Sequence, residues 1–285
     1  MATLRLVIPK GRIYEKVVKL MNDAGYRVSV QGRELKPVSG DPDIELKIMK
    51  PQNIPQIVAL GSHDAGFAGL DWCVETGSTV ETVLDLGSDP VRIVAAVPET
   101  MDDAALRAKR IVVASEYERI TKEWLDREGY SYHYLRVYGA TEVFPPDDAD
   151  MIVDNTSSGA TLRENKLRIV GEVMRSSTRF IANPAALTDP WKKNKIAEMK
   201  LLFASVLTAA RKVMLEMNIP ADKADAVIPK LPCMKAPTVA ELAGGAGFAA
   251  KIVVNRDIVA TLIPELIRLG ATDILEYEIN KVIVV

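Results

Sequence analysis

The chain has 285 residues, enough for about two domains, and its 48% hydrophobic and 26% charged residues are ordinary for a protein with packed cores. The net charge of −2 argues against nucleic-acid binding, and no apolar run approaches the roughly 20 residues of a membrane span. The two cysteines, Cys73 and Cys233, lie far apart and form no metal spacing, so we expect a reducing cytoplasm.

The first third of the chain alternates between strand and helix patterns. In chain order, the patterns predict a strand over 3–8, a helix over 11–24, a strand over 44–49, a helix over 51–60 and a short strand over 65–68. This βαβαβ order predicts an α/β layer with a mostly parallel sheet.

A second α/β set begins near residue 90. It comprises a strand over 91–97, a strand over 111–114, a helix over 120–128 and a strand that includes Val153. A later strand, over 180–183, is expected to return to the sheet of the first set. We therefore expect two lobes joined by crossing strands, with ligands at the carboxyl ends of the strands. The expected bounds are residues 1–90 with 178–210 for lobe I and residues 91–177 for lobe II.

The last part of the chain changes character. An apolar stripe predicts a long helix over 192–217, and the segments that follow predict a short helix over 220–228, a strand over 249–254, a helix over 257–269 and strands over 274–277 and 281–285. This order over so few residues predicts a small α+β domain over 211–285, of a kind used for regulation or oligomerisation.

Residues 148–165 are the stretch with the clearest chemical meaning. An apolar run ends in Asp154, and a loop of small and hydroxyl residues follows. Thr161 and Glu164 have the spacing of a capping box, so a helix is expected to begin at Thr161. Loop amides beside a helix start form an anion cradle, Gly159 allows close approach, and Asp154 can accept hydrogen bonds from sugar hydroxyls. The pattern fits a ribose 5-phosphate, and fits an ordinary βα turn equally well.

The other candidate groups are weaker when taken alone. Lys10 and Arg12 follow the first strand, where a solvated basic turn is the simpler interpretation. Glu142 has the alternative role of a surface acid or a helix first-turn charge. His63 and His133 stand alone and are better explained as surface or supporting groups than as catalysts.

Several short motifs, taken in order, resemble one family. They are Ile8-Pro-Lys-Gly-Arg12, Lys50-Pro-Gln-Asn-Ile-Pro55, residues 64–71, Gly139-Ala-Thr-Glu142, residues 149–162, Pro237-Thr238 and residues 269–275. Together they span nearly the whole chain and resemble the long form of ATP phosphoribosyltransferase, the first enzyme of histidine biosynthesis. That resemblance implies transfer of phosphoribosyl from phosphoribosyl diphosphate (PRPP) to N1 of ATP, with release of diphosphate and with Mg²⁺ as the metal.

The resemblance also implies roles for individual residues. Asp154 would bind the ribose hydroxyls, and the 5-phosphate would lie against Thr156, Ser157, Ser158, Gly159, Ala160 and Thr161. The groups expected to contact phosphates or the nucleotide are Lys10, Gly11, Arg12, Lys50, Asp71 and Glu142. No residue is assigned to the metal.

For the fold, the resemblance implies a two-lobed, periplasmic-binding-protein-like α/β core followed by a small α+β (ferredoxin-like or ACT-like) regulatory domain. Histidine would inhibit by binding this domain near Asn218, Thr238, Val253 and Asp273. The family also implies a homo-oligomer, a dimer or hexamer, in the cytoplasm, with no separate regulatory partner.

Two other functions remain open from the sequence. Two-lobed α/β folds also serve as non-catalytic small-molecule-binding modules, because a fold does not determine a function. An inactive paralogue is the second alternative, because Lys50, Asn53 and Leu70 stand where the family usually has other residues. Lysine in place of arginine keeps the charge but loses the bidentate fork.

Overall fold

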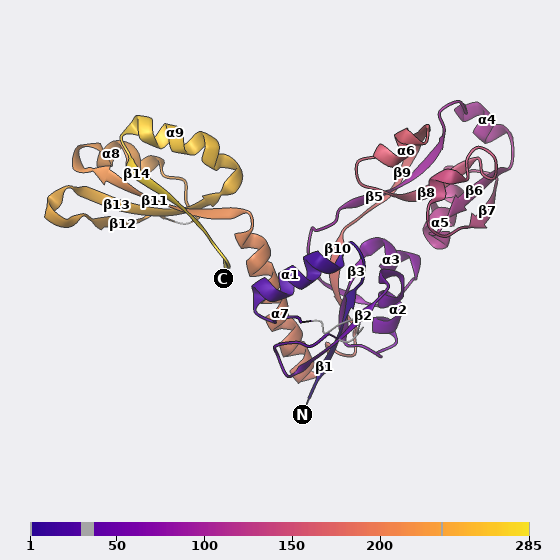
Figure 1. Ribbon diagram of the computed structural model, residues 1–285, viewed down its shortest axis with the longest axis horizontal. Helices are drawn as coiled ribbons and strands as arrows, with labels where there is room; N and C mark the ends of the chain where they lie inside the picture. The colour runs from indigo at the N-terminus through magenta and orange to yellow at the C-terminus, as the bar shows by residue number, and fades with distance from the viewer. Residues whose placement is uncertain (1, 30–36, 235, 285) are drawn as a thin grey trace. The chain divides into compact units, whose positions relative to one another are not determined.

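The computed structural model describes residues 2–29, 37–234 and 236–284 (Figure 1). The chain divides into two compact units, Met1–Asn22 with Tyr26–Glu198 and Asp23–Gly25 with Met199–Val285. Within the described residues, no helix is both long and apolar enough to cross a membrane.

The first unit contains two five-stranded sheets, and the first of them has the order β2-β1-β3-β10-β4. Its strands are β1 (Leu4–Pro9), β2 (Ile44–Met49), β3 (Ala65–Gly69), β4 (Glu81–Asp85) and β10 (Thr178–Ala182). β1 pairs in parallel with β2 and β3, whereas β10 runs antiparallel to β3 and β4. The predicted return of a strand near 180–183 to the first set is therefore confirmed.

The helices of this sheet are α1 (Tyr14–Ala24), α2 (Ile54–Ala59) and α3 (Leu70–Glu75), with a 3₁₀ turn at Pro51–Asn53 before α2. Buried apolar residues in the central strands form the core, and Phe67 stacks on Phe180 with 5.1 Å between ring centroids. β1 is buried at every position except Arg5, as expected of a central strand that is covered on both faces.

The second sheet has the order β7-β6-β8-β5-β9. Its strands are β5 (Val91–Pro98), β6 (Ile111–Ser115), β7 (Tyr132–Arg136), β8 (Met151–Thr156) and β9 (Leu167–Ser176), and its helices are α4 (Asp103–Ala108), α5 (Glu118–Glu128) and α6 (Ala160–Glu164). β6 lies parallel to β7 and β8, and β5 is antiparallel to β8 and β9. Trp72 and Val74 of α3 pack on the core of this sheet, so α3 joins the two layers.

The predicted helix over 192–217 is wrong after Ala209. Helix α7 spans Pro190–Ala209, and the chain then forms β11, Lys212–Pro220. Val213, Leu215, Met217 and Ile219 are all fully buried on one face of β11, which is the two-residue period of a strand. Val213 and Met217 also fit a helical stripe, so the helical pattern of apolar residues continues past the end of the helix.

The second unit is a four-stranded antiparallel sheet with the order β12-β13-β11-β14. β12 spans Thr238–Glu241, β13 spans Gly247–Asn255 and β14 spans Thr272–Glu278, while the helices are α8 (Ala224–Val227) and α9 (Val259–Leu269). The chain order β11-α8-β12-β13-α9-β14 is the split-βαβ, ferredoxin-like arrangement. The expected fold class, an α/β core followed by a small ferredoxin-like domain, is confirmed.

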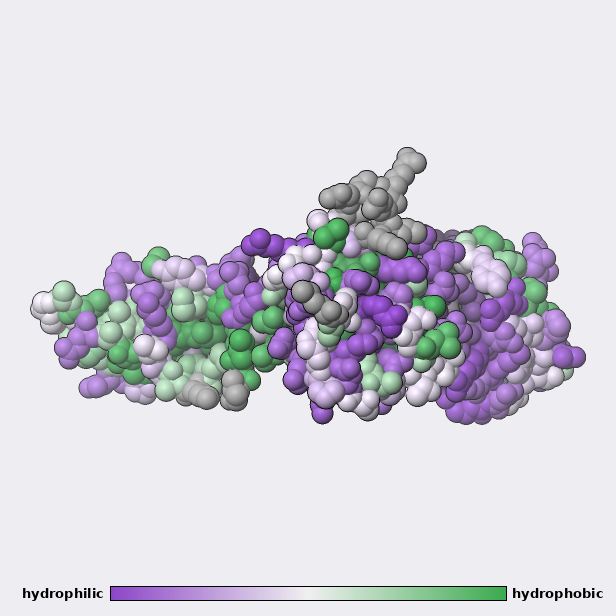
Figure 2. All heavy atoms as spheres, turned by 90° about the horizontal axis from the view of Figure 1, so that it is seen from below, coloured by the Kyte–Doolittle hydropathy of each residue, from purple (hydrophilic) through white to green (hydrophobic). Residues whose placement is uncertain are grey.

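The two faces of this sheet differ. Helices α8 and α9 pack on one face, where the buried residues of β11, β13 and both helices form one core (Figure 1). Seen from the other side, hydrophobic side chains gather on the surface of the unit (Figure 2). Exposed apolar residues of the unit include Met234, Val239, Leu275, Tyr277, Ile283 and Val284.

The predicted last strand over 281–285 is also wrong for its described residues, because 281–284 belong to no strand. The backbone N–H of Val282 donates instead to the carbonyl of Ser205 in α7. An apolar run forms a strand only where a neighbouring strand can pair with it, and here the segment bonds to a helix instead.

Candidate functional site

Asp154 lies in β8, and its carboxylate is held by two neighbours. Thr141, buried in the 3₁₀ turn Thr141–Val143, donates its hydroxyl proton to Asp154 Oδ2, and the backbone N–H of Asn155 donates to Oδ1 at 2.6 Å. Burial raises the pKa of Asp154, against these bonds, and the nearby carboxylate of Glu142 raises it further. The structure therefore holds a partly desolvated acid at the end of a strand, with Glu142 one residue from its hydroxyl donor.

The loop after Asp154 turns through Gly159, which has φ +74°. Two side chains accept loop N–H groups: Thr156 Oγ1 from Gly159 at 3.0 Å and Ser158 Oγ from Ala160 at 3.3 Å. The expected capping box is wrong, because α6 begins at Ala160 and its N-cap, Gly159, makes no side-chain cap bond. Thr161 instead lies inside a helix of only five residues, so the loop amides matter more here than a helix dipole.

Lys10, Gly11 and Arg12 follow β1 directly, and Lys50 follows β2. Because β1 and β2 are parallel, these basic residues come to the same edge of the sheet, and Lys10 N–H donates to the carbonyl of Met49 at 2.8 Å. Gly11 has φ +84°, and a Cβ there would meet no atom within 4 Å, so the glycine serves the turn rather than close packing.

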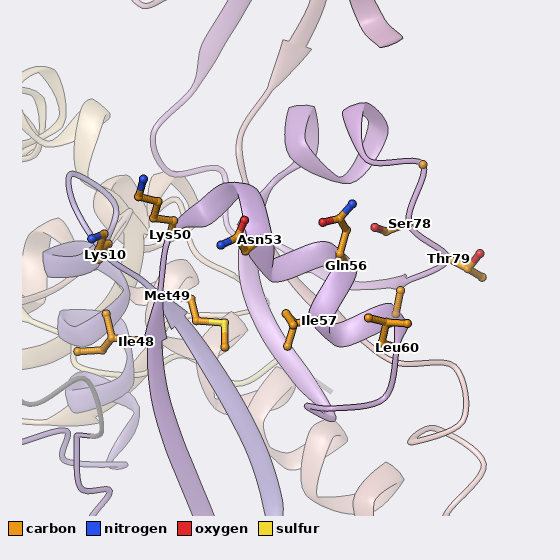
Figure 3. A pocket seen from close by; sticks show the side chains of 12 residues that line it. Lys10, Ile48, Met49, Lys50, Asn53, Gln56, Ile57, Leu60, Ser78 and Thr79 are labelled. Carbon is orange, nitrogen blue, oxygen red and sulfur yellow. The ribbon is translucent and has the colours of Figure 1, made fainter. Parts of the chain in front are cut away.

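A cavity of about 930 Å³ opens beside this edge. Lys10 and Lys50 stand at one end of it, and Leu60, Ser78 and Thr79 stand at the other (Figure 3). Apolar side chains and amides line the rest of the cavity, namely Ile48, Met49, Asn53, Gln56 and Ile57. Its volume lies in the range of small-molecule sites, and it combines apolar walls with a few polar groups.

A second cavity, of about 180 Å³, shares Lys10 with the first and contains Arg12 and Asp71. Both carboxylate oxygens of Asp71 are already bonded: Ser176 donates to Oδ1 at 2.6 Å and Tyr117 donates to Oδ2 at 2.9 Å. Burial and the charge of Asp71 raise the pKa of Tyr117, so its phenol stays protonated and acts as the donor.

Tyr117 also connects this cavity to the Asp154 strand. Its hydroxyl accepts a hydrogen bond from the side-chain amide of Asn155 at 3.3 Å, and Asn155 lines the same cavity. The structure therefore brings Lys10, Arg12 and Asp71 to the residue next to Asp154. Glu142 and the loop over 156–161 line neither of these two cavities, as far as the described residues go.

The residues expected to bind histidine fall into two pairs. Thr238 and Val253 line a cavity of about 480 Å³ in the second unit. Asn218 and Asp273 lie outside that lining and bond to each other, with Asn218 Nδ2 donating to Asp273 Oδ2 at 3.0 Å. A single chain therefore does not gather all four residues around one space.

Four side chains important to this geometry were not singled out from the sequence. Thr141 and Ser176 hold the two acids, Tyr117 links them, and Glu75 accepts hydrogen bonds from three backbone N–H groups at the start of α5. Thr141 lies inside the Gly139-Ala-Thr-Glu142 motif, so its hydroxyl could have been recognised from the sequence as a possible hydrogen-bond donor. The other three act across separations of more than 35 residues, which a local pattern does not reveal.

Over residues 2–29, 37–234 and 236–284, no group of three or more His, Cys, Asp or Glu side chains is placed to hold a metal ion.

Comparison with known proteins identifies relatives over the whole chain. The family model of ATP phosphoribosyltransferase matches residues 50–204, and that of the HisG C-terminal domain matches residues 209–281. The chain is 41% identical to an ATP phosphoribosyltransferase of Desulforudis audaxviator, over 98% of this chain and 99% of the relative. It is 39% identical to that of Chlorobaculum parvum, over 98% of this chain and 97% of the relative.

A solved structure also matches. The ATP phosphoribosyl transferase (HisG:HisZ) complex from Thermotoga maritima contains a chain that superposes with a TM-score of 0.64 at 24% identity. The match covers 71% of this chain and 99% of that one, and it supports the fold.

Proposed function

The chain belongs to the ATP phosphoribosyltransferase family, and we propose that the β8 end and its loop hold PRPP while the basic edge of the first sheet holds polyphosphate. The chain is a pentosyl-transferring enzyme, which joins phosphoribosyl from PRPP to N1 of ATP in the first step of histidine biosynthesis. Near-complete coverage by relatives that carry this enzyme name disfavours the inactive paralogue and the binding module.

The observation that carries the PRPP assignment is Asp154. Its carboxylate is positioned by Thr141 and Asn155, and it is followed at once by the loop whose backbone turns at Gly159. A carboxylate accepts hydrogen bonds from two vicinal hydroxyls, and the loop amides and hydroxyls suit a phosphate. We therefore assign Asp154 to the ribose hydroxyls and residues 156–161 to the 5-phosphate.

Lys10 is the residue that serves both polyphosphates in this proposal. It lines the small cavity with Arg12 and the large cavity with Lys50. We assign the small cavity to the diphosphate of PRPP, because it adjoins Asn155 and therefore Asp154. The large cavity is our candidate for ATP, because it combines two amines with apolar walls.

The reaction asks for positioning and charge stabilisation. N1 of adenine attacks C1 of the ribose, the C1–O bond breaks, and the electron pair leaves with the diphosphate. Preorganised cations near that leaving group act where charge develops, which is the most effective place for them. Lys10 and Arg12 fill this role, and we assign no general base, because adenine N1 already carries the attacking lone pair.

Magnesium fits the lining of the small cavity, which mixes carboxylates with cations. Mg²⁺ binds through one or two protein carboxylates together with substrate phosphates and waters. When bound, it would neutralise charge on the diphosphate. Asp71 and Asp89 are the carboxylates of that lining.

We further propose that histidine inhibits the enzyme through the second unit and that the chain assembles with copies of itself. Thr238 and Val253 supply one half of a histidine site and Asn218 with Asp273 the other, so two copies would complete it. Exposed apolar residues of this unit, such as Leu275 and Tyr277, offer surface for that assembly. A reducing cytoplasm suits two free cysteines, Cys73 and Cys233.

The test is diphosphate release from ATP, PRPP and Mg²⁺, measured with and without millimolar histidine. Turnover that histidine suppresses supports the catalytic and the regulatory assignments together. Turnover that ignores histidine removes the regulatory assignment alone. If no diphosphate is released and PRPP does not bind, the catalytic assignment is wrong.

A further inference from the structure

The small cavity contains two buried oxygens that have no hydrogen-bond partner. They are Oδ2 of Asp89 and Oγ1 of Thr178, and both residues line the cavity. The Asp89 side chain is only 6% exposed, and Thr178 is 1% exposed. A buried polar atom without a partner is costly, so such an atom points to a ligand that supplies the missing bond.

The backbone places these two residues together. Thr178 begins β10, and the turn after β4 brackets it: Leu86 N–H donates to the Thr178 carbonyl, and Thr178 N–H donates to the Ser88 carbonyl, each at 3.0 Å. Asp89 then takes φ +49°, a left-handed conformation that is uncommon outside glycine. Lys16 bonds to Asp89 Oδ1 at 2.7 Å, which leaves Oδ2 as the oxygen without a partner.

The charges around the cavity select the kind of ligand. Lys10 and Arg12 would repel a bare metal cation, and Asp71 and Asp89 would repel a bare phosphate. A metal–diphosphate complex presents both signs and suits both sets. Each oxygen of Asp71 already accepts one hydrogen bond, from Ser176 or from Tyr117, whereas Oδ2 of Asp89 accepts none and keeps its full capacity for a metal.

We propose that Oδ2 of Asp89 coordinates the Mg²⁺ that accompanies the diphosphate of PRPP, and that the Thr178 hydroxyl hydrogen-bonds to a water of that ion. The proposal rests on the proposed function, because it uses the assignment of the small cavity to diphosphate. It adds a protein ligand for the metal and makes Asp89 a selector for the metal-bound form of the substrate.

The test is the effect of a substitution at Asp89 on diphosphate affinity, which should differ in sign with and without Mg²⁺. Inorganic diphosphate is titrated calorimetrically into the full-length protein, with Mg²⁺ or with a chelator, for wild type and Asp89→Asn. Asparagine tolerates the left-handed backbone. Mg²⁺ should tighten wild-type binding by about tenfold or more, and Asp89→Asn should lose most of that gain. Metal-free diphosphate should bind the variant as well as wild type or better, because a repelling charge is gone.

Lys16→Gln is the matched control, because it breaks the same ion pair and leaves the carboxylate in place. It should keep the Mg²⁺ gain. If the two variants behave alike, the role of Asp89 is the ion pair and the proposal is wrong. The proposal is also overturned if Asp89→Asn keeps the full Mg²⁺ gain.

A measurement on wild type avoids any dependence on the folding of a variant. With Mn²⁺ and diphosphate bound to protein labelled with ¹³C at the aspartate carboxyl carbons, electron–nuclear double resonance should show the coupling of a directly bonded carboxylate. Its absence overturns the proposal. If the wild-type protein turns over ATP and PRPP but shows no such coupling, the proposed function stands and the metal proposal is wrong. If it binds neither metal-bound nor metal-free diphosphate, the proposed function and the metal proposal are both wrong.

Discussion

Replacing Asp154 with asparagine separates the binding role of this carboxylate from its effect on stability. The substitution keeps the size of the side chain and one acceptor oxygen but removes the charge. Because burial raises the pKa of Asp154, the ionised group is unfavourable in the folded protein. The same charge should strengthen the hydrogen bonds to the ribose hydroxyls. Asp154→Asn should therefore weaken PRPP binding and, at neutral pH, should not destabilise the fold.

The magnitude for binding follows from two hydrogen bonds. A bond to a charged acceptor contributes about 1 kcal/mol more than one to a neutral acceptor, so two bonds lose about 2 kcal/mol. That corresponds to roughly a 30-fold rise in the dissociation constant for PRPP. In the variant, the Asn155 N–H can still donate to the remaining oxygen and the Thr141 hydroxyl can turn to accept from the new amide, so the side chain stays in place and the loss belongs to the ligand.

The effect on stability has a defined pH dependence. A raised folded pKa means that the acid contributes stability below its ordinary pKa of 3.8 and loses that contribution as pH rises through the folded value. The unfolding free energy of Asp154→Asn relative to wild type should therefore increase across that interval and stay constant above it.

Two measurements decide this prediction. Calorimetric titration with PRPP gives the dissociation constant, and denaturant unfolding between pH 3.5 and 8, a range chosen to span the ordinary value, gives the stability difference. An unchanged PRPP affinity would refute the assignment of Asp154 to the ribose. A stability difference that falls as pH rises would refute the reasoning about its burial.

Three further predictions follow. Glu75→Ala should cost about 1–2 kcal/mol of unfolding free energy in denaturant, because three N–H groups at the start of α5 lose their acceptor. The control Glu123→Ala, on the exposed side of that helix, should cost almost nothing. Equal losses in the two variants would contradict the capping role of Glu75. Gly159→Ala and Gly129→Ala both force alanine into a left-handed conformation (φ +74° and +72°), so each should cost about 1–2 kcal/mol of stability, but calorimetry should show weaker PRPP binding only for Gly159→Ala. Burial raises the pKa of Cys73 to about 12, so alkylation of the native protein at pH 8 should leave Cys73 unmodified until the chain is unfolded; rapid labelling of Cys73 would show that the thiol is not buried as described.

The sequence predicted elements well where one periodicity stood alone. β2 matches its predicted bounds, and α5 and β5 lie within two residues of theirs, because each has a pattern that fits one structure only. The α7–β11 boundary was missed because apolar residues there satisfy both helical and strand spacing. β12 went unrecognised because its four residues are all exposed and leave no apolar pattern.

The candidate site divides in the same way. Asp154 and the loop over 156–161 were readable because they are contiguous, and Lys10 and Lys50 were readable because each follows a strand. Asp89 and Thr178 carry no motif, and only the pairing of β10 with β4 brings them together. Contacts such as Ser176 with Asp71, separated by 105 residues, depend on topology, which local patterns do not encode.

Three unfavourable features of the first unit lie in these same places. Asp154 has a charge that burial opposes, Asp89 has a left-handed backbone and an unbonded buried oxygen, and Gly159 turns through positive φ. Stability alone would favour a neutral residue in place of Asp154, and each such feature costs on the order of 1 kcal/mol or more. All three lie beside the space assigned to PRPP, where sugar hydroxyls, a metal ion and a phosphate would supply the missing partners. The strain is therefore best understood as a site prepared for its ligand, and substrate binding should stabilise the enzyme against unfolding.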